Sequence, residues 1–150
     1  MRLALFEPDI PQNTGTLMRL CACLGVPMDI IEPCGFILSD KNLRRAGMDY
    51  LDHLDLTRHT DWDAFKGASG SKRLVLLSTK SSDSFLDFNF QPDDILIAGR
   101  ESAGVPGYIH EQCAARVRIP MAAGMRSLNV ALASALVLSE ALRQTGGYPI

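Results

Sequence analysis

The sequence lacks the features that usually mark secreted, membrane-spanning or metal-binding proteins. Its four cysteines form no C-x-x-C pair, and Cys21 and Cys23 are two residues apart on a predicted helix, so they cannot chelate one ion. No run approaches the roughly 20 apolar residues that cross a bilayer, and Glu7 cuts the first apolar stretch too early for a signal peptide. We therefore expect one cytoplasmic domain over residues 1–150, with no metal site and no membrane contact.

Common nucleotide motifs and an excess of positive charge are also missing. The chain has 15 Lys and Arg against 17 Asp and Glu, so any binding to nucleic acid must use a local patch or one assembled between subunits. No G-x-G-x-x-G or G-x-S-x-G occurs, and Gly104 is followed by Val105-Pro106 rather than the Lys-Ser/Thr of a phosphate loop. An ordinary NAD or ATP site is therefore not expected.

What the sequence does contain is a regular alternation of short apolar runs with helical patterns. The runs at 73–78 and 94–98 are typical of strands buried on both faces. Alternating strands and helices predict an α/β fold, a parallel sheet flanked by helices on both faces. Strands are expected at 3–6, 28–31, 53–56, 73–78, 94–98 and 116–119, and helices at 14–24 (capped by Asn13 or Thr14 and stopped by Gly25), 40–46, 61–66, 106–113 and 127–144.

The last of these helices is apolar almost all the way round. Between Leu128 and Leu138 only Asn129 and Ser134 are polar. A helix without a polar face must be buried on every side, and one small domain cannot cover so much apolar surface. We therefore expect this helix to be a subunit contact in a homodimer.

Polar or glycine-containing loops follow four of the predicted strands. Ligands bind at the carboxyl ends of the strands in a parallel sheet, so we expect these loops to meet there. Taken alone, the loop that begins at Gly99 is better explained as a plain turn. The loops begin at Asn13, Thr79, Gly99 and Met121.

Two groups of basic residues could contact phosphates. Gly15 and Arg19 share a helix face, which leaves space over which the guanidinium can fold. Lys41, Arg44 and Arg45 share another face at i, i+3 and i+4. For both groups a solvated helix face is the alternative interpretation.

The motifs taken in order resemble those of one enzyme family. N-x-G-x-x-x-R at 13–19, G-x-E-x-x-G-x-P at 99–106 and I-P-M…S-L-N-V at 119–130 resemble the SpoU-like branch of the SPOUT RNA methyltransferases. The segments E-P-D-I-P-Q-N-T-G at 7–15, I-E-P-C-G-F at 31–36 and R-R-A-G-M-D-Y at 44–50 are similar to the subfamily that 2′-O-methylates the wobble nucleotide of tRNA. One departure is Ala131, where relatives often place a serine.

This resemblance implies a fold, a cofactor and a set of partners. It implies S-adenosylmethionine as methyl donor, a homodimer, a C-terminal trefoil knot, and the anticodon stem-loop of tRNA, in particular leucine tRNAs, as substrate. The knot rests on the resemblance alone, because general folding rules make knots very rare. Methylation of another tRNA or rRNA site, a non-catalytic RNA-binding module and a nucleotide-binding oxidoreductase are the alternatives.

The resemblance also assigns roles to residues. Arg19 would be the catalytic arginine, either as a base in surroundings that favour its neutral form or as a grip on a phosphate, since a free guanidinium is a poor base. Asn13, Glu101, Ser127 and Asn129 would support the catalytic site. The cofactor would contact Leu77, Ser78, Thr79, Gly99, Arg100, Glu101, Ile119, Met121, Ser127 and Leu128, and RNA would contact Arg19, Lys41, Arg44 and Arg45.

Overall fold

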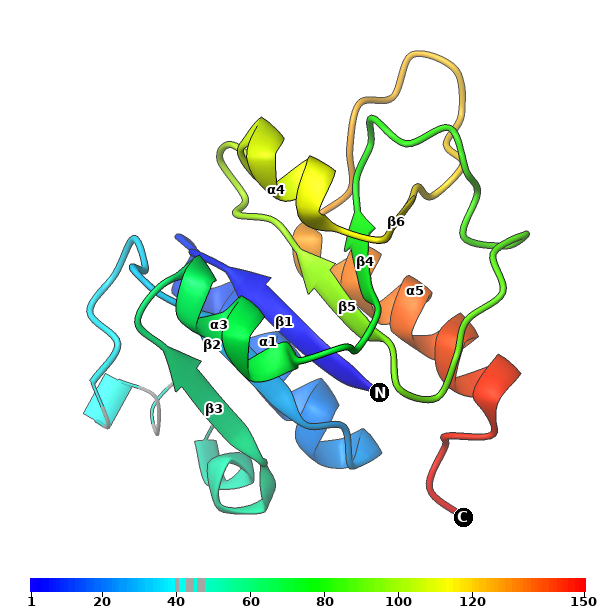
Figure 1. Cartoon of the computed structure of the whole chain (residues 1–150). Helices are drawn as coiled ribbons and strands as arrows, with labels where there is room; N and C mark the ends of the chain where they lie inside the picture. The colour runs from blue at the N-terminus through cyan, green and yellow to red at the C-terminus, as the bar shows by residue number, and fades with distance from the viewer. Residues whose placement is uncertain (40, 43–44, 46–47) are drawn as a thin grey trace.

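The apolar runs of the sequence form one six-stranded sheet (Figure 1). The computed structural model describes residues 1–39, 41, 42, 45 and 48–150. All strand pairs are parallel, in the order β3-β2-β1-β5-β4-β6, which confirms the predicted parallel α/β architecture. The strands are β1 (Arg2–Phe6), β2 (Met28–Ile31), β3 (Leu56–His59), β4 (Leu74–Leu77), β5 (Ile95–Ala98) and β6 (Ala115–Val117).

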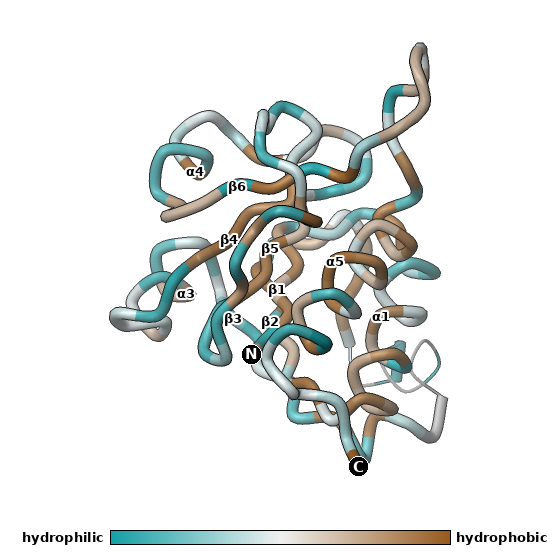
Figure 2. Tube along the Cα trace, turned by 90° about the vertical axis from the view of Figure 1, so that its right-hand side faces the viewer, coloured by the Kyte–Doolittle hydropathy of each residue, from teal (hydrophilic) through white to brown (hydrophobic). Residues whose placement is uncertain are grey.

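Helices cover both faces of the sheet, because alternate residues of each strand point to opposite sides. In β1, Leu3 and Leu5 belong to the core under α1 (Pro11–Leu24) and α5 (Val130–Thr145). Ala4 and Phe6 belong to the core under α3 (Trp62–Ser69) and α4 (Gly107–Gln112). Figure 2 shows the apolar strands lying between these two helical layers, with α1 and α5 on one side and α3 and α4 on the other.

Helix α1 begins at Pro11, three residues before the predicted start at residue 14. Proline suits the first helical position because its missing N–H needs no partner there. The expected cap at Asn13 or Thr14 is therefore wrong: both side chains lie within the first turn and are buried. The expected stop is confirmed, since Gly25 adopts a left-handed conformation with φ of 65°.

Helix α5 begins at Val130, after the predicted start at residue 127. The Oδ1 atom of Asn129 accepts hydrogen bonds from the N–H groups of Ala131 and Leu132, so Asn129 is the cap. The expected burial of this helix on every side is wrong for the single chain. Leu132 is 61% exposed and Leu136 is 47% exposed, on the side of α5 away from the sheet.

The largest error in the predicted elements lies between 40 and 60. The strand expected at 53–56 is wrong: Met48–His53 forms a 3-10 helix, η1, and β3 starts only at Leu56. As an edge strand, β3 pairs with β2 alone and tolerates Thr57 and Arg58, so apolar alternation does not mark it. The helix expected at 40–46 falls largely on residues outside the described part of the chain.

Candidate functional site

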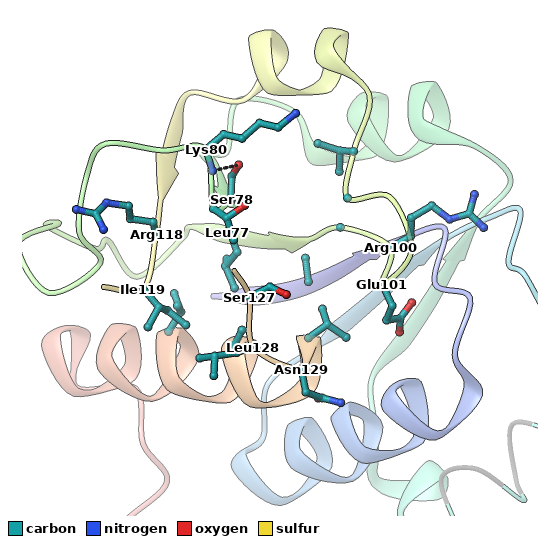
Figure 3. Close-up of a pocket in the computed structure, with 18 of the residues that line it drawn as sticks. Leu77, Ser78, Lys80, Arg100, Glu101, Arg118, Ile119, Ser127, Leu128 and Asn129 are labelled. Atoms are coloured by element: carbon teal, nitrogen blue, oxygen red, sulfur yellow. Dashed lines mark hydrogen bonds between the residues drawn. The ribbon is translucent and has the colours of Figure 1, made fainter. Parts of the chain in front are cut away.

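The loops at the carboxyl ends of the strands surround one pocket (Figure 3). Its volume of about 440 Å³ is within the usual range of small-molecule sites. Figure 3 shows Leu77, Ile119 and Leu128 around its apolar part, while the Arg100 side chain turns away from it. Within the described residues, no helix is long and apolar enough to cross a membrane, and no group of three or more His, Cys, Asp or Glu is placed to hold a metal ion.

The structure brings together all ten residues that the resemblance assigns to the cofactor. They come from the last residue of β4 and from the loops after β4, β5 and β6, which are far apart in the sequence. Their contacts with a ligand stay a prediction, whereas their common location is a feature of the protein alone. The residues that line the pocket from this set are Leu77, Ser78, Thr79, Gly99, Arg100, Glu101, Ile119, Met121, Ser127 and Leu128.

The loop after β5 is a tight turn that closes on itself. The N–H of Arg100 donates to the carbonyl of Gly104 at 3.1 Å, and the N–H of Gly104 donates back at 2.8 Å. A Cβ atom on Gly99 would lie 2.8 Å from two backbone carbons of Gly104. The turn interpretation and the ligand interpretation of this loop are thus compatible, because the glycine allows the close approach that shapes the pocket wall.

Three polar side chains join the loop after β5 to the starts of α1 and α5. The Asn129 Nδ2 donates to Asn13 Oδ1 at 3.0 Å, and Asn13 Nδ2 lies 3.4 Å from Glu101 Oε1. Asn13 is 9% exposed, so its amide is held by these partners rather than by water. With Ser127, they are the four predicted supporting residues of the catalytic site, and all four line the pocket.

Asp9 is a member of this cluster that sequence reasoning missed. Its Oδ1 accepts from the N–H of Glu101 at 3.1 Å, and its own N–H donates to Glu101 Oε2 at 2.9 Å. Hydrogen bonds with Glu101 and Ser102 lower the pKa of Asp9 to about 2, whereas burial, followed by the Asp9 interaction, raises the pKa of Glu101. No local pattern could have indicated contacts across 92 residues of sequence.

The predicted RNA-binding residues are placed less uniformly. Arg19 is exposed on α1 and does not line the pocket of its own chain; its guanidinium carbon lies 4.8 Å from the centre of the Tyr50 ring. Lys41 and Arg45 are exposed, and Arg44 lies outside the described residues.

Two further cations, which sequence reasoning did not select, line the pocket. Lys80 is exposed, and the Arg118 guanidinium is anchored by its Nε to the carbonyl of Ser82 at 3.4 Å. Both follow strands of the sheet, as the carboxyl-end rule requires, but neither belongs to a motif.

Comparisons with known proteins agree over nearly the whole chain. The model of the SpoU rRNA Methylase family matches residues 1–139. The tRNA (cytidine(34)-2′-O)-methyltransferase of Beijerinckia indica subsp. indica is 61% identical over 146 residues, which cover 96% of this chain and 91% of that protein. A structure solved for work on the 2-OH methylation of C/U34 on tRNA has a TM-score of 0.89 and 39% identity, covering 95% of this chain and 94% of that one. The SpoU methyltransferase AviRb of Streptomyces viridochromogenes, solved with AdoMet, has a TM-score of 0.80 and 27% identity, covering 96% and 60% of the two chains.

Proposed function

The chain belongs to the SpoU methylase family, and from that premise we propose that it transfers a methyl group from S-adenosylmethionine to the 2′-hydroxyl of the wobble nucleotide, position 34, of tRNA. The observation that carries the proposal is the single pocket lined by every predicted cofactor residue. The relatives named for cytidine-34 methylation cover nearly the whole chain, which favours this site over another tRNA or rRNA position.

The residues present fit S-adenosylmethionine. Leu77, Ile119 and Leu128 offer apolar surface for a purine ring, and the loop closed at Gly99 offers backbone groups. When bound, this cofactor supplies a methyl group already activated on a sulfonium. The 2′-hydroxyl that would accept this methyl group must also lose its proton. The chain's own contribution is to align the hydroxyl and to receive or neutralise that proton.

A transfer assay tests the proposal directly. Methyl-labelled S-adenosylmethionine is incubated with total tRNA, and the labelled nucleotide is mapped; we expect label on the 2′-oxygen of nucleotide 34, as C or modified U, in a small set of tRNAs that includes leucine tRNAs. Cofactor binding without transfer to any RNA would favour a non-catalytic RNA-binding module. Label at another tRNA or rRNA position would contradict the wobble assignment. Binding of a nicotinamide cofactor in place of S-adenosylmethionine would favour an oxidoreductase.

We further propose that the working enzyme is a homodimer. Leu132 and Leu136, one turn apart on α5, are 61% and 47% exposed, and they form a leucine stripe that water should not cover in a stable monomer. Arg19 lies outside the pocket of its own chain, so a second copy offers a route by which this arginine reaches the reacting atoms. Dimerisation also joins two modest basic surfaces, which suits an RNA substrate despite the net charge of −2.

The role of the leucine stripe in the dimer can be tested by replacing its leucines with charged residues. We expect the double variant Leu132→Glu, Leu136→Glu to be monomeric in sedimentation analysis and to lose methyl transfer, because two carboxylates would be buried in the interface. Leu86→Glu is the matched control: Leu86 is 60% exposed but lies in the loop after β4, so this variant should stay dimeric and active. A monomeric and fully active wild-type chain would contradict the dimer.

The trefoil knot and the RNA surface remain part of the same proposal. The segment after β6 runs against the loop after β4: Arg118 N donates to Asp83 O at 2.8 Å, and Phe85 N donates to Arg118 O at 2.9 Å. This pairing supports a C-terminal segment threaded past that loop. Lys41, Arg44 and Arg45, with Arg19, are proposed to contact the anticodon stem-loop in the cytoplasm, where tRNA substrates are found.

A further inference from the structure

Asp9 makes its contacts with three consecutive residues of the loop after β5. Its carboxylate accepts from the Glu101 N–H at 3.1 Å and from the Ser102 hydroxyl, and its Oδ2 lies 3.6 Å from Arg100 Nε. The Asp9 N–H donates to Glu101 Oε2 at 2.9 Å. One residue therefore holds both the backbone and the side chain of Glu101.

The other side of Asp9 is also fixed. A Cβ atom on Gly35 would lie 2.5 Å from the Asp9 Cβ, and the Gly35 N–H donates to the carbonyl of Pro8 at 2.9 Å. At the end of β1, Glu7 adopts a left-handed conformation with φ of 42°, which a non-glycine residue rarely does. Strained backbone of this kind persists where the surrounding structure demands it, and here it turns Asp9 toward the loop after β5.

We propose that Asp9 is a positioning residue, whose carboxylate and N–H hold the loop after β5 closed against the pocket and keep Glu101 turned toward Asn13. Asp9 does not line the pocket, so it acts through Glu101 rather than on the substrate. The inference rests on the proposed methyl transfer, in which Glu101 supports the catalytic site.

The charge of Asp9 gives this role a measurable signature. Among the described residues, the charged group in contact with Glu101 is Asp9, and Asn13 contributes a neutral amide. Asp9 in turn lies 3.6 Å from Arg100, which lies 3.6 Å from Glu7. Burial raises the pKa of Glu101 most, and the carboxylate of Asp9, which stays ionised, raises it further, so Glu101 takes up a proton first as the pH falls. Removal of the Asp9 charge must therefore lower the pKa of Glu101 and extend its ionised range to lower pH.

Two variants separate the charge from the hydrogen bonds. In Asp9→Asn the Oδ1 acceptor for Glu101 N–H remains, so we expect cofactor affinity within about twofold of wild type and an acidic limb of the kcat profile moved to lower pH. In Asp9→Ala the charge and the hydrogen bonds that the carboxylate accepts are lost and only the N–H donor to Glu101 remains, so we expect cofactor affinity to fall about tenfold and kcat about a hundredfold. Binding is measured by calorimetry without RNA, and transfer in single turnovers on tRNA.

The outcomes distinguish this inference from its premise. If wild type binds the cofactor but methylates no RNA, the proposed function fails. The cofactor affinity of Asp9→Ala then still reports whether Asp9 holds the loop after β5 closed. If both variants only lower the thermal midpoint, with an unchanged pH profile and unchanged cofactor affinity, Asp9 is merely structural and the inference is overturned.

Discussion

Arg19→Ala is expected to lower methyl transfer by a factor of about 10³ or more while leaving cofactor affinity within about twofold. The affinity should survive because Arg19 does not line the pocket of its own chain. The rate should fall because we propose that this arginine of the N-x-G-x-x-x-R motif orients the nucleotide or assists removal of the hydroxyl proton. Single-turnover transfer and calorimetric titration measure the two effects separately.

The role of Arg19 is resolved by a second variant and a control. Arg19→Lys keeps a positive charge but not the planar fork, so it should retain part of the activity if the guanidinium grips a phosphate. Lys72→Ala removes an exposed cation that precedes β4, at the opposite edge of the sheet, and should change neither parameter. Normal turnover by Arg19→Ala would remove Arg19 from the catalytic site.

Hybrid dimers show which pocket Arg19 serves. If it serves the partner's pocket, a mixture of Arg19→Ala with a pocket-disrupted Gly99→Val chain forms hybrids with one complete site. Random mixing then restores about a quarter of wild-type transfer, since half of the dimers are hybrids with one site of two. If Arg19 serves its own pocket, no hybrid contains a complete site and the mixture stays inactive.

The sequence predicted best those features that depend on local chemistry. β2 was predicted with its observed ends, because all four residues at 28–31 are buried and three of them are apolar, and Gly25 marked the end of α1. The edge strand β3 was misplaced because an edge needs pairing on one side only and carries no apolar signal. The local sequence pattern also did not indicate that the Asn13 side chain, instead of capping α1, accepts a hydrogen bond from Asn129, 116 residues away.

For the site, the motifs indicated which loops matter, but not how they are held. Each loop follows a strand, so a parallel sheet requires the loops to meet at one edge, and the pocket lies there. The position of Arg19 could not be inferred this way. The helix face that it shares with Gly15 does not indicate whether Arg19 acts at the pocket of its own chain or at that of a second copy. Asp9 was missed because its role depends on tertiary contacts with residues 100–102.

Gly99→Ala is expected to weaken cofactor binding at least about a hundredfold, although it adds a single carbon. That carbon would lie 2.8 Å from both the Cα and the carbonyl carbon of Gly104, and real Cβ atoms essentially never approach so closely. Backbone cannot move aside as a flexible side chain can, so the paired hydrogen bonds between Arg100 and Gly104 must open. The opened loop would then displace Glu101 as well as the pocket wall.

Two neighbouring glycines make the comparison specific. Gly104 has φ of 64° but open space around its missing Cβ, so Gly104→Ala should cost only about 1 kcal/mol of backbone strain and reduce affinity about tenfold or less. Gly107, at the start of α4, has no neighbour within 4 Å of that position, and Gly107→Ala should bind like wild type. Calorimetry at one temperature, with thermal midpoints to confirm folding, ranks the three variants. Each variant adds one carbon, so the ranking follows from whether that carbon meets backbone atoms. If Gly99→Ala lost no more affinity than Gly107→Ala, the pocket would tolerate an open loop and Gly99 would be only a turn residue.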